Sequence, residues 1–429
     1  MINLVVGIVV MGFLLASGLW ISFAIGIGGL ASLWQRGLPI LYTIGLESWW
    51  TTTNFILVAV PLFVFMGEIL FNTGLLDRSY TTLRVLLAGL KGDLVQTTIA
   101  ACTLFAAMCG SSTASAATMG RISYPELVEK RHYDRKLVLG AVAAGSTLGI
   151  LIPPSIILII YGAMAEQSVG RLFAAGFIPG FILAGFFVVY IYLRVWRNPK
   201  LVAATTEKVT IRDRLVGILN LIPFLALILL VLGSIYAGWA TPTESAALGC
   251  AGALVMAAAY RRLTWRALRE STRNTVILTA MIVLLIIAAK VMARALTAYQ
   301  VPVLIRSWGE AIQSPAMLYL ITIAFYIVVG CIFDGLAAMV VTLPFMLPFI
   351  TQGGFDPIWF GIVMVILAEM AMLTPPIGIN LFVLQGVTGA SFSEVTKGSL
   401  PFLFGHVMLL VLLYFFPQIA LWLPGLLFQ

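Results

Sequence analysis

Apolar segments long enough to cross a lipid bilayer follow one another through the whole 429-residue chain. Since about 20 apolar residues in a helix span the hydrocarbon core, such a chain folds within the membrane rather than around a soluble core. Hydrophobic residues make up 61% of the sequence and charged residues only 10%, against roughly 25% charged in soluble domains. We therefore predict an all-α polytopic membrane protein with apolar segments at 3–20, 21–34, 50–72, 94–119, 137–165, 173–195, 215–238, 244–260, 274–299, 314–350, 357–388 and 399–424.

Charge and motif content exclude several classes of function. The net charge is +8, but the basic residues separate apolar segments instead of lining one face, so we expect no nucleic-acid partner. The chain has no G-x-x-x-x-G-K-[ST] loop, which excludes ATP as an energy source on this chain. With two histidines and four cysteines at no zinc-site spacing, a metal-dependent hydrolase is excluded as well.

The two halves of the chain resemble each other when the sequence is shifted by 222 residues. Pro153 and Pro154 then fall on Pro375 and Pro376, and Gly176 falls on Gly398. Prolines and glycines carry this match, whereas a chance likeness between membrane segments would rest on leucines. The sequence therefore predicts two repeats, 1–213 and 214–429.

Four of the segments are interrupted and do not read as simple crossings. Small and polar residues break 94–119 and 314–350 near their middles, which predicts re-entrant hairpins. Double prolines break 137–165 and 357–388, and because proline removes a backbone donor, these are predicted to be discontinuous helices.

An odd number of crossings in each half makes the second repeat inverted relative to the first. This model places three basic residues, Arg36, Arg171 and Arg306, on one side, and Lys290 and Arg294 inside a span. The other 20 of the 25 lie on the opposite side, which the positive-inside rule identifies as cytoplasmic. Both termini are then periplasmic, and the two hairpins enter from opposite faces.

Inverted repeats with paired hairpins and broken helices are typical of secondary transporters with a site near the bilayer midplane. The run from Gly110 to Ser115 offers hydroxyls and backbone carbonyls that suit Na⁺, and exposed helix N-termini suit a carboxylate. Helix packing through small residues is the competing explanation for this run.

Intramembrane polar residues are the next candidates. Glu68, Glu244, Asp334 and Glu369 fall within or near spans, and Asp334 precedes Gly335 at the predicted tip of the second hairpin. Glu68 and Lys290 occupy equivalent repeat positions, and each is expected to serve either a site or a structural pair. Asn380 lies just beyond the second double proline, where its amide is a candidate cavity group.

Three strings carry a resemblance to a known family: CGSSTASAATMGRISYPELVEKRHYDRKLVLGAVAAGSTLGILIPPS, GCIFDGLAAMVVTLPFMLPF and LTPPIGINLFVLQG. They resemble the large membrane subunit of the tripartite ATP-independent periplasmic (TRAP) transporters, and the likeness covers essentially the entire chain. It implies sodium coupling, an elevator-type movement, a small four-helix membrane subunit and a periplasmic substrate-binding protein. Organic-acid substrates are implied too, with sialic acid favoured and C4-dicarboxylates next. The small subunit is expected as a separate chain in the bacterial inner membrane.

Matching the family's motifs to this chain places the first hairpin tip at 110–115 and the second at Asp334 and Gly335. It places the first helix break at 152–155 and the second at 374–378. One Na⁺ is expected between the first tip and first break, and another between the second tip and second break. The predicted substrate-binding residues are Ser112, Thr113, Ser115, Ser155, Asp334 and Asn380. The predicted sodium-binding residues are Gly110, Ser111, Ser112, Pro153, Asp334, Gly335, Thr374, Pro376 and Gly378.

Two other classes of function stay open at this stage. An ion or organic-anion channel also uses hairpins, although channels usually place them on an oligomer axis. An intramembrane enzyme is the remote alternative, because the chain has no G-x-S-x-G motif and Asp334 has no partner aspartate at a similar depth. We therefore predict a transporter and no enzymatic activity. Its moving block is expected to contain the hairpins and broken helices, while 173–195 and 399–424 belong to the fixed scaffold.

Overall fold

The computed structural model describes residues 2–90, 92–203, 209–312 and 314–428, and all its secondary structure is helical. The all-α prediction is therefore confirmed. Lys91 and Lys208, two of the basic residues assigned to the cytoplasmic side, lie outside the described residues. The α-helices are α1 Ile2–Ala16, α2 Ile21–Trp34, α3 Ile40–Thr52, α4 Ala59–Asn72, α5 Leu75–Leu87, α6 Asp93–Cys109, α7 Ser112–Tyr124, α8 Arg135–Leu151, α9 Ile156–Ala165, α10 Val169–Arg197, α11 Ile211–Tyr236, α12 Pro242–Ala259, α13 Trp265–Ala298, α14 Val301–Ala311, α15 Pro315–Gly330, α16 Gly335–Thr351, α17 Pro357–Leu373, α18 Ile379–Thr388, α19 Phe392–Phe415 and α20 Gln418–Leu427. Short helical turns cover Phe55–Val58, Pro125–Lys130 and Pro199–Leu201.

The helix bounds repeat with the 222-residue shift. Helix α17 begins and ends at the positions equivalent to those of α8, and α15 begins at the position equivalent to the start of α6. Each hairpin is a helix pair, α6 with α7 and α15 with α16, and each broken helix is a second pair, α8 with α9 and α17 with α18. The predicted hairpins, discontinuous helices and repeat are thus present as elements. Helix α11 begins at Ile211, so the division between 1–213 and 214–429, which stays a prediction, falls in its first turn.

The two repeats interlock through glycines. A Cβ atom at Gly140 in α8 would lie 2.0 Å from the carbonyl oxygen of Gly398 in α19. The equivalent contact joins Gly176 in α10 to α17, where a Cβ would lie 3.7 Å from Cδ1 of Ile362. Each repeat therefore packs its long helix against the broken helix of the other, as the internal two-fold relation requires.

This packing concerns the two segments that are expected to belong to the fixed scaffold, an expectation that stays a prediction. Helices α10 and α19, the structural counterparts of 173–195 and 399–424, pack against the broken helices α8 and α17. Gly140, Ala143 and Ala144 of α8 are all buried, and Gly140 lies in the contact with α19. The block around the breaks accordingly includes α10 and α19.

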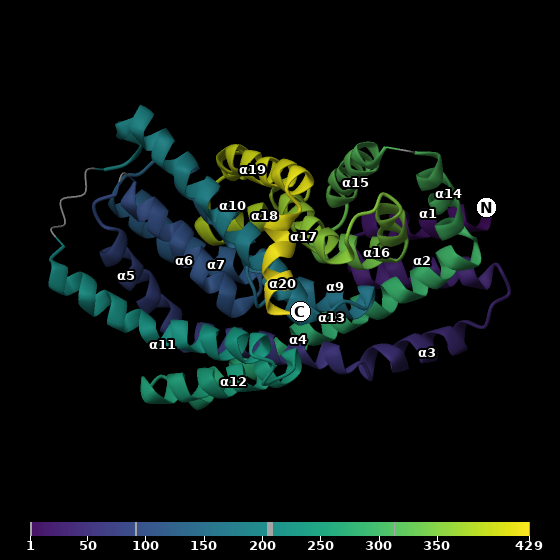
Figure 1. Cartoon of the computed structure of the whole chain (residues 1–429), viewed down its shortest axis with the longest axis horizontal. Helices are drawn as coiled ribbons and strands as arrows, with labels where there is room; N and C mark the ends of the chain where they lie inside the picture. The colour runs from purple at the N-terminus through teal and green to yellow at the C-terminus, as the bar shows by residue number, and fades with distance from the viewer. Residues whose placement is uncertain (1, 91, 204–208, 313, 429) are drawn as a thin grey trace.

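A second group of helices lies along one side of this block. Helices α4, α11, α12 and α13 run along the lower edge of Figure 1, and α2 packs against α13. Helix α13 extends over 34 residues and also contacts α4 and α16. This group contains helices from the early part of each repeat, and we call α2, α4, α11, α12 and α13 the scaffold layer.

The span predictions need two corrections at helix level. Helices α3, α5 and α14 were not predicted, because each is shorter than a crossing and carries polar residues. The segment 399–424 is divided at Pro417 into α19 and α20. Among the described residues, six helical segments are long and apolar enough to cross a membrane: Phe55–Asn72, Arg135–Ala165, Val169–Arg197, Ile211–Tyr236, Trp265–Ala298 and Phe392–Phe415.

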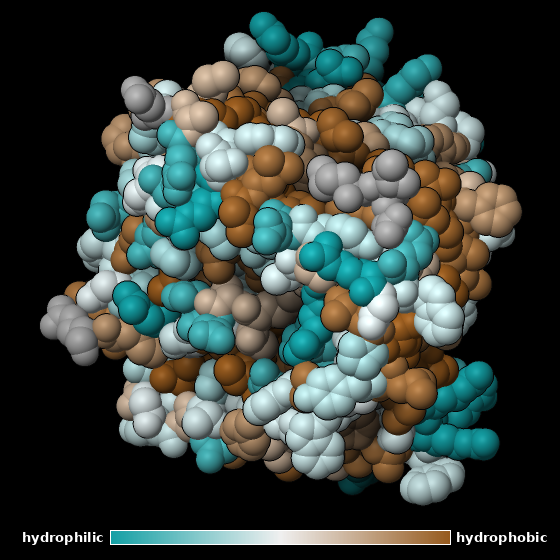
Figure 2. All heavy atoms as spheres, turned by 90° about the vertical axis from the view of Figure 1, so that its right-hand side faces the viewer, coloured by the Kyte–Doolittle hydropathy of each residue, from teal (hydrophilic) through white to brown (hydrophobic). Residues whose placement is uncertain are grey.

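The two ends of the long axis differ. At the end where α5 finishes and α11 begins, Arg84 lies in the last turn of α5, and the Arg214 guanidinium of α11 donates to the Ala88 carbonyl over 3.0 Å. We call this the basic end. The N-terminus, α3 and α14 lie at the other end (Figure 1), and Figure 2 shows hydrophilic and hydrophobic residues intermixed across that face.

Candidate functional site

The first hairpin tip lies against the first helix break. Helix α6 ends at Cys109, and Gly110 turns the chain with φ of +61°, a conformation that glycine adopts without strain. Ser111 then caps α7 by accepting a hydrogen bond from Ala114 N, and its Oγ lies 3.3 Å from the Thr113 hydroxyl. A Cβ at Gly110 would lie 3.1 Å from the Pro154 carbonyl oxygen, so the tip and the break are in contact.

The first break uses its polar groups internally. Pro153, Pro154 and Ser155 are all buried. The Ser155 hydroxyl donates to the Ile150 carbonyl over 2.5 Å and accepts from Leu158 N as the cap of α9. The structure therefore places Ser155 beside the tip as a capping residue.

The second hairpin tip lies against the second break in the same way. Asp334 caps α16, where its Oδ1 accepts from Ala337 N over 2.6 Å. A Cβ at Gly335 would lie 2.9 Å from the Ala368 carbonyl oxygen in α17, and the Cys331 thiol lies 3.6 Å from the Pro375 carbonyl. The predicted pairing of each tip with its own break is present in both repeats.

The second break is more open than the first. Pro376 is exposed and Thr374 is half-buried, although the Thr374 hydroxyl donates to the Met370 carbonyl over 2.7 Å. Gly378 starts α18 with φ of +46° and a buried backbone. The two breaks thus share a fold but differ in how far their backbone groups are exposed.

One hydrogen bond joins the two tip-and-break pairs. Asn380 in α18 donates from Nδ2 to Ser112 Oγ in α7 over 2.6 Å, and both residues are buried. The Asn380 Oδ1 atom has no hydrogen-bond partner among the described residues. A buried acceptor without a partner is costly, so this oxygen is suited to a cation or an N–H or O–H group of a ligand.

Two cavities lie between the hairpins and the scaffold layer. The hairpin-1 cavity has a volume of about 290 Å³ and is lined by α7 together with α4 and α13. The hairpin-2 cavity has a volume of about 330 Å³ and is lined by Asp334, Trp20 and α13. Both include Ile282, so this single α13 side chain stands between the two hairpins.

Glu68 and the equivalent Lys290 belong to scaffold helices. Glu68 Oε2 accepts from Asn72 Nδ2 over 3.0 Å and from Asn274 Nδ2 over 2.8 Å, and it lines the hairpin-1 cavity. Glu47 in α3 is paired with Arg294, one turn from Lys290 on α13. Glu244 lies apart from both cavities, in a capping box with Thr241 at the start of α12.

Sequence reasoning missed one buried pair. His406 Nε2 lies 3.2 Å from Glu369 Oε2, and both side chains are fully buried between α17 and α19. Glu369 was noted as an intramembrane acid, but the two residues are 37 positions apart and only the packing of α19 on α17 brings them together.

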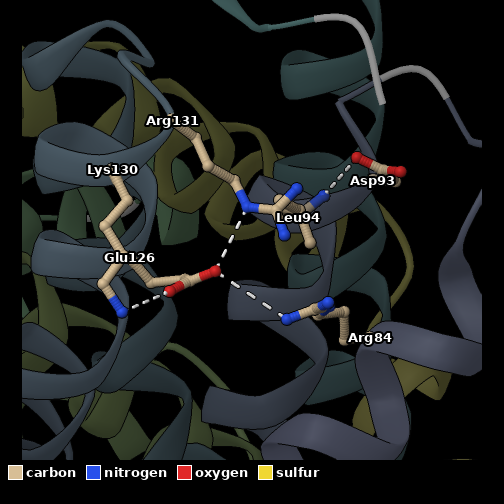
Figure 3. A network of polar contacts seen from close by, with 6 residues as sticks. All are labelled: Arg84, Asp93, Leu94, Glu126, Lys130 and Arg131. Atoms are coloured by element: carbon tan, nitrogen blue, oxygen red, sulfur yellow. Dashed lines mark hydrogen bonds and ion pairs between the residues drawn. The ribbon is translucent and has the colours of Figure 1, made fainter. Parts of the chain in front are cut away.

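A charge network holds the base of the first hairpin at the basic end. Glu126 bonds Lys130 and Arg131 at 3.1 Å each, and Arg84 of α5 lies 3.8 Å away (Figure 3). Partial burial acts to raise the pKa of Glu126, but the hydrogen bonds and charges of Lys130 and Arg131 outweigh it, and the pKa is lowered. The network links α5 to the hairpin.

The comparisons with known proteins cover nearly the whole chain. Residues 6–419 match the family model described as "Tripartite ATP-independent periplasmic transporter, DctM component". A C4-dicarboxylate TRAP transporter large permease protein of Pseudomonas aeruginosa is 33% identical over 94% of each chain. A sialic acid TRAP transporter large permease protein of Vibrio cholerae is 30% identical over 87% of each chain.

Two further relatives extend the comparison. An isethionate TRAP transporter permease protein of Oleidesulfovibrio alaskensis is 30% identical over 96% of this chain and 65% of its own length. Among solved structures, the YdaH transporter of Alcanivorax borkumensis aligns with a TM-score of 0.59 at 15% identity over 88% of each chain, which shows a shared fold. The matched permeases are transporter subunits, so the prediction of a transporter rather than an enzyme is confirmed. The chain therefore belongs to the DctM component family of the tripartite ATP-independent periplasmic transporters and is a multi-pass inner-membrane protein.

Proposed function

We propose that this chain carries an organic acid across the inner membrane in symport with Na⁺. The observation that supports this most directly is the buried Asn380 Oδ1 without a partner, next to the Ser112 hydroxyl where the two repeats meet. Interruptions of membrane helices at the midplane are tolerated where they line a binding site, and their carbonyls and helix ends bind ions and carboxylates.

Two Na⁺ sites follow from the paired tips and breaks. The first would use oxygen atoms around Gly110, Ser111, Ser112 and Pro153, and the second would use those around Asp334, Gly335, Thr374, Pro376 and Gly378. The close approaches of Gly110 to Pro154 and of Gly335 to Ala368 support both assignments, because they bring backbone carbonyls to each tip. Hydroxyl, carboxylate and carbonyl oxygens suit a hard cation.

The substrate class is proposed from the relatives. The matched permeases are named for C4-dicarboxylate, sialic acid and isethionate, all of which are acids. We propose an organic acid, with sialic acid favoured over C4-dicarboxylates. Ser112, Thr113, Ser115, Ser155, Asp334 and Asn380 remain the proposed substrate-contacting set.

An elevator movement accounts for access from both sides. The hairpins, broken helices, α10 and α19 pack as one block through the interlocking contacts at Gly140 and Gly176. A block held together in this way moves against the scaffold layer as a unit. The partners proposed are a small four-helix membrane subunit and a periplasmic substrate-binding protein, and both termini are placed in the periplasm.

Uptake by the reconstituted complex tests this function. Proteoliposomes with the small subunit and binding protein should accumulate a labelled acid when Na⁺ is outside, with saturation and without ATP. Equal uptake with K⁺ replacing Na⁺ would contradict sodium coupling. Uptake that rises linearly with substrate concentration would instead favour an anion channel.

A further inference from the structure

The hairpin-1 cavity contains one cationic side chain, Arg121, on the last turn of α7. Arg121 is exposed toward this space, and the described residues include no ion-pair partner for it. An unpaired guanidinium beside a cavity of about 290 Å³ suits a carboxylate or sulfonate, which it holds through two parallel hydrogen bonds.

Hydroxyl groups lead along α7 from the hairpin tip toward Arg121. Ser111, Ser115 and Thr118 line the same cavity, at helical spacings that place them on one face. The Ser115 hydroxyl is only 1% exposed and has no hydrogen-bond partner among the described residues beyond a weak contact with the Cys102 thiol. A buried hydroxyl without a firm partner is available to a ligand in the cavity.

The same cavity contains one carboxylate, Glu68, on α4. Its Oε2 is held by the amides of Asn72 and Asn274, and the ion pairs among the described residues include none to Glu68. A second carboxylate on a substrate would be repelled by the Glu68 carboxylate, whereas hydroxyl or amide groups of a substrate could donate hydrogen bonds to it.

We propose that the hairpin-1 cavity selects singly charged acids that also carry hydroxyl or amide donors, with Arg121 binding the anionic group and Glu68 excluding a second one. This inference rests on the proposed transport of an organic acid and narrows its substrate class. It favours sialic acid or a hydroxylated sulfonate over a C4-dicarboxylate. Arg121 and Glu68 are then specificity-determining residues.

Inhibition of uptake by acids placed inside the proteoliposomes measures the selectivity of this cavity without a contribution from the binding protein. The whole complex is reconstituted in one orientation, the binding protein is added outside only, and uptake is measured for whichever of labelled N-acetylneuraminate, isethionate or succinate is taken up. The lumen is loaded in turn with N-acetylneuraminate, gluconate or succinate. In the wild type, N-acetylneuraminate and gluconate should each inhibit uptake at a concentration about tenfold lower than succinate does. A tenfold difference corresponds to about 1.4 kcal/mol of repulsion between Glu68 and the second carboxylate of succinate.

Variants then assign the selectivity to the two residues. Arg121→Gln should raise the lumenal concentration needed for inhibition by N-acetylneuraminate about 10- to 100-fold, as expected for the loss of a charged hydrogen bond. Arg121→Lys should retain part of the affinity for N-acetylneuraminate that Arg121→Gln loses. Glu68→Gln should lower the inhibitory concentration of succinate to nearly that of the two monoanions. Arg212→Gln, which removes an exposed positive charge from the basic end outside the cavity, serves as the control and should change nothing.

The outcomes separate this inference from the proposed function. No sodium-dependent uptake of any of the three acids would contradict the proposed function itself. Sodium-dependent uptake in which lumenal succinate inhibits as well as N-acetylneuraminate, or in which Arg121→Gln behaves like Arg212→Gln, would overturn the inference alone. Folding of each variant is checked by size-exclusion chromatography and by retained Na⁺-dependent thermal stabilisation.

Discussion

Asn380 of the second broken helix donates a hydrogen bond over 2.6 Å to Ser112 at the first hairpin tip, with both side chains buried. This contact spans the two repeats, 268 positions apart in the chain. It leaves the buried Asn380 Oδ1 without a hydrogen-bond partner among the described residues, so the amide group is both a link between the repeats and a candidate ligand.

Removing either partner of this contact should weaken Na⁺ binding more than folding. We expect Ser112→Ala and Asn380→Ala each to raise the Na⁺ concentration for half-maximal uptake several-fold. Ser112→Ala removes an oxygen of the first proposed Na⁺ site, and Asn380→Ala removes the amide that bonds this oxygen. The double variant should cost about 1 kcal/mol less than the sum of the two singles. Thr388→Ala in the same helix is the control, since its hydroxyl bonds the backbone at Leu384. Wild-type sodium dependence in both single variants would show that the first tip is misassigned.

Adding a methyl group at the interlocking contact should destabilise the fold. A Cβ at Gly140 would lie 2.0 Å from the Gly398 carbonyl oxygen, so Gly140→Ala forces the α8 and α19 backbones apart. We expect a loss of about 1–3 kcal/mol or more, seen as a lower thermal midpoint in detergent. Gly185→Ala in α10, where nothing lies within 4 Å of the added atom, should be neutral. Equal midpoints for the two variants would contradict the close packing.

The Glu126 network predicts a pH-dependent difference in stability. The lowered pKa of Glu126 means that the charged form is stabilised in the folded protein, and this stability is present above the unfolded value of about 4.3 and lost as pH falls through the folded value. Glu126→Gln should therefore lower the free energy of unfolding at pH 7 by up to about 1 kcal/mol per pair, measured as a lower thermal midpoint. The difference from wild type should close below about pH 4.

The pair Arg306–Glu310 provides a matched control for this measurement. Both side chains are at least 60% exposed, so Glu310→Gln should change stability little at any pH. High salt should also narrow the Glu126 gap. A gap that is constant from pH 7 to pH 3.5 would exclude a charge-based role for the network.

The buried pair of Glu369 and His406 should behave as a unit. His406→Leu leaves the buried Glu369 carboxyl group without a polar neighbour among the described residues. Glu369→Leu leaves His406 Nε2 in the same state, while His406 Nδ1 keeps its contact with the Phe402 carbonyl. Each change alone should therefore cost about 3–5 kcal/mol. The double variant should recover a large part of this loss. Glu394→Gln, at an exposed capping box on α19, should cost about 1 kcal/mol or less. Additive losses in the double variant would argue that the two side chains do not interact.

Reagent access tests the proposed orientation. In a background without reactive native cysteines, Arg266→Cys at the start of α13 should react only from the cytoplasm. Glu310→Cys at the other end should react only from the periplasm. Impermeant maleimide labelling of intact cells and of inverted vesicles measures both. Labelling of the two positions from one side would reject the inverted arrangement.

The breaks and hairpin tips were predictable from sequence because their causes are local. The double prolines that contain Pro153 and Pro376 disfavour continuation of a helix, Gly110 permits a tight turn, and Ser111 and Asp334 are good capping residues. Their repetition at one shift made the pairing of tips and breaks predictable as well.

The remaining features depend on tertiary packing. The contacts of α10 and α19 with the opposite repeat, and the pair of Glu369 with His406, arise between residues whose sequence neighbours carry no sign of the partner. Arg121 is one of the 20 basic residues that the sequence places in cytoplasmic loops, because it follows the predicted hairpin 94–119. Only the position of α7 beside α4 and α13 shows that it lines a cavity.

The glycine contacts that join α8 to α19 and α10 to α17 determine when, during synthesis, the fold can be completed. The first repeat leaves the ribosome with its broken helix and long helix still lacking their partners, since α17 and α19 are synthesised more than 150 residues later. The block therefore completes only when the C-terminal repeat has entered the membrane. Truncation after the first repeat removes both partners at once, and the two halves produced as separate chains must find each other before either reaches its native packing.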